Sequence, residues 1–115
     1  MTSRALLLIA GLSGAAGVAL AARGTHAAEG EVSIAANFLL LHAAVFIGIS
    51  LLPNRLSQIA GYVLFVALIL FAGDLVLRGE YGHSLFPLAA PAGGIGLIVG
   101  WLLLAASALA GKAKS

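Results

Sequence analysis

Residues 56–77 have the sequence LSQIAGYVLFVALILFAGDLVL, an apolar run in which Asp74 is the single charged side chain. A helix needs about 20 mostly apolar residues to cross a bilayer, so this run is long enough to do so. Lipid leaves backbone amides no water to bond, and a helix satisfies them within the segment itself. The run therefore predicts a transmembrane helix over residues 56–77.

Three further apolar runs lie along the chain, and they predict helices over residues 5–22, 33–52 and 91–110. Together the four spans use nearly all of the 115 residues, which leaves no room for a separate soluble catalytic module. The sequence thus predicts an all-α fold: one transmembrane domain, residues 1–115, built as a bundle of four transmembrane helices.

Glycine and proline set the predicted helix ends. Gly24 is expected to end the first helix, and Arg78-Gly79 the third, because glycine adopts the left-handed conformation of a helix terminus. Pro53-Asn54 is a turn signal between the second and third helices, with Asn54 or Ser57 suited to cap the helix that follows. Pro91 is acceptable in the first turn of the fourth helix.

The first run has a competing explanation, a secretory signal peptide. Arg4 would then be its basic region, residues 6–20 its apolar region, and residues 25–27 a small-residue cleavage site. The three later runs need another helix to complete a bundle. We therefore favour a retained span.

The distribution of charge predicts the orientation in the membrane. Four spans place both termini and the Pro53 turn on one side, where the bases are Arg4, Arg55, Lys112 and Lys114. The opposite side has Arg23 and Arg78, diluted by Glu29, Glu31 and Glu80. Because positive charge gathers on the cytoplasmic side, both termini are expected in the cytoplasm.

Composition excludes several classes of protein. Apolar residues are 62% of the chain and charged residues 9%, and the six bases are scattered, so no nucleic-acid-binding patch is expected. Cysteine is absent, which excludes disulfides, thiolate metal sites and thiol catalysis. No pair of nucleophile and base can be assembled, so we expect no catalytic residues, no metal, no cofactor and no enzymatic activity.

His42 is the first candidate polar site inside the membrane. It lies about nine residues into the second helix, or roughly 14 Å below its start, close to mid-depth. It is a candidate proton relay, substrate ligand or axial ligand to a cofactor. Because no second histidine lies at matching depth, we favour a neutral imidazole bonded to a neighbouring helix.

Asp74 is the second candidate, one turn before the outer end of the third helix. A carboxylate embedded in the membrane is a candidate proton or cation site by default. However, Arg78 follows four residues later on the same helical face, in the favourable order for an ion pair. Both interpretations stay open.

Chain order brings four polar residues toward one outer-facing zone: His26, Asn37, Asp74 and His83. Histidine and carboxylate together are possible metal ligands, but the spacing His-x-x-x-His is missing. We therefore expect a hydrogen-bond network at the level of the lipid headgroups.

Small residues suggest close helix packing, because small faces let backbones approach where the hydrophobic effect cannot drive association. In the first helix the small face consists of Ala10, Gly14, Gly17 and Ala21, with Gly11 nearby. In the fourth it consists of Gly93, Gly96 and Gly100. Whether these faces pack within the bundle or against another protein stays open. For Gly100 we favour packing within the bundle, because the neighbouring Trp101 is bulky and is expected to face lipid or a partner.

Several short motifs occur in an order that resembles the YgdD-like family of small four-helix bacterial inner-membrane proteins. They are Met1-Thr2-Ser3-Arg4, Gly24-Thr25-His26, Phe38 with His42, Phe71-Ala72-Gly73-Asp74-Leu75, Pro91-Ala92-Gly93-Gly94 and Gly100-Trp101. The family has unknown function and mitochondrial relatives. The resemblance implies a four-pass fold in the bacterial inner (plasma) membrane and supplies no activity.

The chain departs from the family pattern at four positions. Ala72 and Asp74 stand where the family has serine, Ala90 where it has threonine and Leu39 where glutamine is common. The first three changes remove hydroxyl groups from any small-molecule site that the family shares, and the fourth removes an amide.

Two functions agree with these features. The first is a non-enzymatic accessory or scaffold subunit that packs against a larger membrane complex or lipid, with self-association as a further option. Small size and glycine-rich faces favour it. The alternative is a minimal proton or small-solute transporter or channel that uses His42 and Asp74, although only residues 87–96 hint at the broken helix that transporters favour.

Overall fold

The computed structural model describes residues 3–26 and 30–112, with the backbone alone at residues 24–26 and 110–112. Over these residues the chain forms four helices and no strand: α1 Arg4–His26, α2 Glu31–Ser50, α3 Arg55–Tyr81 and α4 Ala89–Lys112. Each helix contains a stretch that is long and apolar enough to cross a membrane. The predicted all-α fold of four membrane-spanning helices is confirmed.

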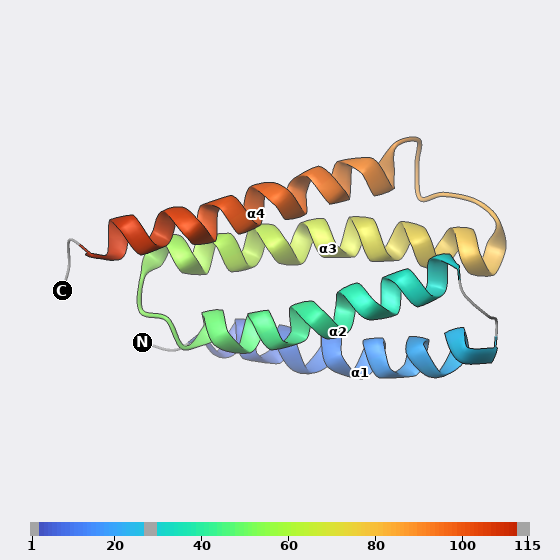
Figure 1. Ribbon diagram of the computed structural model, residues 1–115, viewed down its shortest axis with the longest axis horizontal. Coiled ribbons are helices and arrows are strands. Elements are labelled where there is room, and N and C mark those ends of the chain that lie inside the picture. The colour runs from blue at the N-terminus through green and yellow to red at the C-terminus, as the bar shows by residue number, and fades with distance from the viewer. Residues whose placement is uncertain (1–2, 27–29, 113–115) are drawn as a thin grey trace.

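The helices lie side by side, and each runs antiparallel to the next (Figure 1). α1 begins, α2 passes into α3 and α4 finishes at one end of the bundle, which we name the terminal end. Residues 82–88, the connector between α3 and α4, lie at the opposite end, the connector end. The molecule measures 49 × 26 × 18 Å, and its long axis is close to the roughly 40–45 Å of a bilayer with its headgroups.

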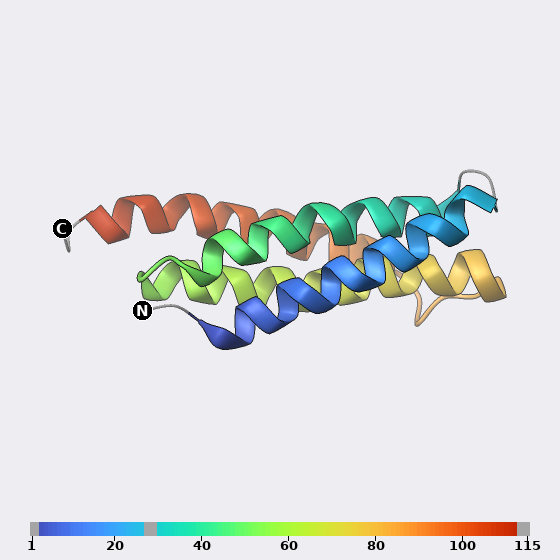
Figure 2. The ribbon, with the colours of Figure 1, turned by 90° about the horizontal axis from the view of Figure 1, so that it is seen from below.

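Packing follows chain order. α1 packs on α2, α2 on α3 and α3 on α4, and α1 also touches α3 where it crosses the bundle obliquely (Figure 2). Among the described residues α1 and α4 do not pack on each other, so the bundle is not a closed ring. α3 has the largest buried share of the four spans, and α1 and α4 have the smallest. The outward faces of α1 and α4 are therefore left for lipid or a partner.

The helix bounds of α2 and α4 differ from the predicted 33–52 and 91–110 by two residues at each end, and the two ends assigned to glycine differ as well. α3 continues past Gly79 to Tyr81, and Gly82 ends it with φ 80° and an N–H that bonds the carbonyls of Leu77 and Arg78. Gly79 serves instead a close approach of α2, because a Cβ atom there would lie 2.6 Å from Cγ2 of Val32. α1 likewise continues past Gly24 to His26. Glycine alone does not distinguish a helix end from a helix contact.

The turn between α2 and α3 bonds both α3 and α4 through the Asn54 side chain. Of the two cap candidates, the structure selects Asn54. Its side-chain oxygen accepts hydrogen bonds from the backbone N–H of Leu56 and of Ser57 at the start of α3. Its amide nitrogen donates to the Ser107 carbonyl at 3.0 Å. The start of α3 is thereby fixed to the end of α4.

The glycines of α4 lie against α3. A Cβ atom at Gly93 would lie 2.6 Å from the Phe71 backbone nitrogen, at Gly96 2.8 Å from Ala67 Cβ, and at Gly100 2.6 Å from Leu64 Cδ2. In α1 the corresponding contacts are from Gly14 to Ala43 and from Gly17 to Leu40, both on α2. These faces pack within the bundle. Gly11 differs, because it faces outward with no atom within 4 Å of a Cβ position.

Candidate functional site

His42 lies in the interior of α2 with 1% of its surface exposed. Its Nδ1 lies 2.8 Å from the Phe38 carbonyl oxygen, which can only accept, and its Nε2 lies 3.3 Å from the Trp101 indole nitrogen, which can only donate. Nδ1 must therefore carry the hydrogen and Nε2 must be bare. This is a neutral imidazole with both ring nitrogens bonded.

Aromatic rings surround this imidazole. Phe38 stacks on it with ring centres 6.0 Å apart, and Phe46 and Trp101 approach at 6.3 and 5.8 Å. Trp101 is 39% exposed, so it joins the interior of the bundle to its outer face. The backbones of α2 and α4 do not pack on each other among the described residues, and the Trp101 side chain reaches across from α4 to bond His42 on α2.

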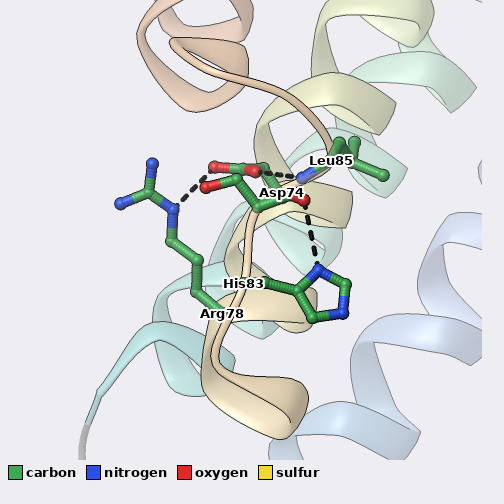
Figure 3. A network of polar contacts seen from close by, with 5 residues as sticks. Asp74, Arg78, His83 and Leu85 are labelled. Carbon is green, nitrogen blue, oxygen red and sulfur yellow. Dashed lines mark hydrogen bonds and ion pairs between the residues drawn. The ribbon is translucent and has the colours of Figure 1, made fainter.

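Asp74, on α3 near the connector end, is fully buried. Its Oδ2 accepts a hydrogen bond from Nε of Arg78 at 2.9 Å, and its Oδ1 accepts one from the backbone N–H of Leu85 at 2.8 Å (Figure 3). The Arg78 side chain is 39% exposed, so the counterion reaches the surface while the carboxylate stays inside. Asp74 thus fixes the connector against α3.

The structure brings together only part of the predicted outer polar zone. His83 lies in the connector close to Asp74, and its Nδ1 donates to the Ser84 carbonyl at 3.3 Å (Figure 3). Asn37 is exposed on α2, and within the described residues no hydrogen bond joins it or His83 to Asp74. The His26 side chain lies outside the described part of the chain.

An ion pair that the sequence analysis missed lies at the same end. Arg23, near the end of α1, pairs with Glu80, near the end of α3. Nε and Nη2 of Arg23 donate hydrogen bonds to the two carboxylate oxygens of Glu80. The Arg23 side chain is 64% exposed and the Glu80 side chain 19%. The available signal was the opposite charge of two residues that four antiparallel spans place at the same membrane face.

The described residues satisfy their own polar groups. Among them no buried side-chain nitrogen or oxygen lacks a hydrogen-bond partner. No three of their histidine, aspartate and glutamate side chains gather as the ligands of a metal ion would. The hydrogen bonds of His42 join α2 to Trp101 of α4, and those of Asp74 join α3 to the connector.

Comparison with known proteins agrees with this architecture. Residues 14–94 match the family model described as "Protein of unknown function (DUF423)". The chain belongs to this family. It is 29% identical over 126 residues to the "UPF0382 inner membrane protein YgdD" of Escherichia coli K12, covering 99% of this chain and 96% of the relative. It is 23% identical over 119 residues to the "UPF0382 membrane protein YwdK" of Bacillus subtilis 168, covering 92% and 97%.

These relatives confirm the resemblance that the sequence motifs indicated. The full-length similarity to an inner membrane protein and the four apolar helices place the chain in the bacterial inner membrane as a multi-pass protein. No solved structure matches the chain.

Proposed function

We propose that this protein is a non-enzymatic accessory or scaffold subunit of the inner membrane that packs against a larger membrane complex or against lipid. The observation that carries the proposal is that the two ionisable side chains buried among the described residues are both engaged within the fold. His42 has both ring nitrogens bonded, and Asp74 has both carboxylate oxygens bonded. Ionisable groups inside a membrane are functional candidates by default. Here their polar atoms bond helices and the connector, which favours a structural role.

The outer surface supports a packing role. Large apolar side chains are exposed on the two helices at the edges of the bundle, including Leu8, Leu12 and Val18 on α1 and Ile95, Leu102 and Leu109 on α4. Gly11 lies among those of α1 with open space beside it. A surface of this kind suits contact with other helices or acyl chains, where van der Waals packing is the main source of association.

The alternative function, a minimal proton or small-solute transporter or channel, would use the same His42 and Asp74. A relay group must exchange its hydrogen-bond partners during transport. His42 sits among three aromatic rings, and Asp74 is tied to a backbone N–H, so both arrangements oppose such exchange. The transporter hypothesis gains no support from these contacts.

The test is copurification of the protein expressed at its native level, after mild crosslinking in cells. We expect a stable larger assembly with another membrane protein. Gly11→Leu adds bulk to the outward face of α1, and Gly48→Leu is its matched control on α2, because Gly48 also has open space around it. Loss of the partner with one variant and not the other would locate the contact. Recovery of the wild type only alone or as its own oligomer would contradict a role as a subunit of a larger complex.

A further inference from the structure

A groove of about 500 Å³ opens on the outer surface between α3 and α4. Branched and aromatic side chains of α3, including Ile59, Val66 and Leu70, form one wall. Ala92 and Gly96 of α4 form the other, and their small size leaves the space open. Apart from the Tyr62 hydroxyl, the lining side chains are apolar, so the groove suits hydrocarbon.

The length of the groove matches one leaflet. Ile59 and Leu70 are eleven residues apart on α3, which is about 16 Å at the rise of an α-helix. Half of the roughly 30 Å hydrocarbon core of a bilayer is about 15 Å. The groove therefore extends from near the surface at the terminal end to about the middle of the membrane, as the acyl chain of a single leaflet does. A transmembrane helix of a partner would extend through both leaflets.

A basic side chain lies at the surface end of the groove. Arg55 is the first residue of α3 and precedes Ile59 by four residues, so the two lie on the same helical face. Arg55 is exposed, and no side chain within the described residues forms an ion pair with it. α3 has 27 residues, about 40 Å of helix, which exceeds the hydrocarbon thickness and puts Arg55 at headgroup level.

We propose that this groove binds one acyl chain of an anionic phospholipid from the leaflet at the terminal end, with the phosphate group at Arg55. The apolar lining, the one-leaflet length and the free guanidinium above it select this occupant. Basic sites between transmembrane helices are suited to anionic headgroups. The proposal goes beyond the accessory role, since it holds whether or not a larger complex covers the other faces of the bundle.

The test is native mass spectrometry of the purified protein titrated with phosphatidylglycerol or phosphatidylcholine of identical acyl chains. We expect the wild type to bind one phosphatidylglycerol about five-fold more tightly than phosphatidylcholine, the ratio for about 1 kcal/mol from one base near an anionic headgroup. Arg55→Gln should abolish this preference. Arg4→Gln removes the same charge at the same end, away from the groove, and should leave the preference unchanged.

A second pair of variants tests the groove itself. Ala92→Leu fills it from α4 and should weaken the binding of both lipids, whereas Ala105→Leu, exposed on the same helix outside the groove, should not. If Ala92→Leu does not fold, Val66→Phe fills the groove from an exposed position on α3.

Three results would overturn the proposal. The first is equal binding of the two lipids by the wild type, and the second is equal loss of preference in Arg4→Gln and Arg55→Gln. The third is a wild type that proves to be a dimer and that Ala92→Leu converts to a monomer with lipid binding unchanged, which would assign the groove to a second copy of the chain. None of these results bears on copurification with a larger complex, so the two proposals fail separately.

Discussion

His42 and Asp74 are both almost fully buried in the helices of a membrane protein, yet the fold holds them in different ways. His42, near mid-depth, is neutral and enclosed by aromatic rings. Asp74, near the connector end, is paired with Arg78, whose side chain reaches the surface. The difference shows how depth governs polar chemistry in lipid, because a charge is tolerated where its counterion can reach the headgroups.

The two sites also stabilise different parts of the molecule. His42 and Trp101 join α2 to α4, which adds to the packing of α2 on α3 that holds the α1–α2 pair against the α3–α4 pair. Asp74 acts within the α3–α4 pair, where it holds the connector. Substitution of His42 should therefore weaken the packing of the helices, whereas substitution of Asp74 should release the connector from α3.

The comparison of His42 with Asp74 assumes that the terminal end and the connector end lie on opposite faces of the membrane. The chain lacks cysteine, so single cysteines at Pro53 and at His83, both exposed, report the two ends without background. We expect an impermeant thiol reagent added to intact cells to label His83→Cys and not Pro53→Cys, because the bases favour a cytoplasmic terminal end. Labelling of both cysteines from the same face would contradict the four-pass arrangement.

The next largest effect is expected at Asp74. Asp74→Ala removes the acceptor for Arg78 and for the Leu85 N–H, and should lower the free energy of unfolding by about 1.5–3 kcal/mol, the range for hydrogen bonds to charged groups. Asp74→Asn keeps an acceptor for the Leu85 N–H and should cost less. Unfolding in mixed micelles measures both variants. Equal losses would show that the bond to Leu85 adds nothing.

A smaller effect is expected at His42 and is best isolated with Trp101 in a double-mutant cycle. His42→Phe and Trp101→Phe each remove the indole-imidazole hydrogen bond while keeping a ring in place. We expect a coupling energy between about 0.6 and about 1.7 kcal/mol, the average and the maximum from double-mutant cycles between membrane helices. A coupling energy near zero would show that this hydrogen bond adds nothing to the packing of α2 on α3 that joins the two helix pairs.

The smallest effect is expected for the ion pair of Arg23 and Glu80 at the connector end. The Arg23 side chain is mostly exposed, and exposed ion pairs gain little because solvent screens them. Glu80→Gln should therefore leave the midpoint of thermal unfolding unchanged within error, at low and at high salt. A clear loss of stability at low salt alone would give this pair a structural role comparable to that of Asp74.

The fold could be predicted from the sequence because lipid imposes it directly. Apolar runs of sufficient length must be helices, and short turns make neighbours antiparallel, so the four spans needed no information about contacts. The ends were less certain because glycine has two uses. Gly82 ends α3, whereas Gly79 makes room for Val32 of α2. The sequence alone does not distinguish these two roles of glycine.

The candidate site was predictable in part. His42 and Asp74 are conspicuous because ionisable residues are rare in the spans, and Arg78 could be paired with Asp74 from its position four residues later. Trp101 could not be assigned to His42, because the two lie 59 residues apart on helices whose backbones do not pack together. The groove beside Ala92 and Gly96 depends on the register of α4 against α3, which no single sequence specifies.

The central claim is that His42 and Asp74 hold the fold together and do not conduct protons. The most direct test measures proton flux and unfolding free energy on the same purified protein, the flux in liposomes under an imposed pH gradient, for the wild type, His42→Phe and Asp74→Asn. We expect flux equal to that of empty liposomes in all three, with lower stability in both variants. A wild-type flux above background that either substitution abolishes at unchanged stability would contradict the account.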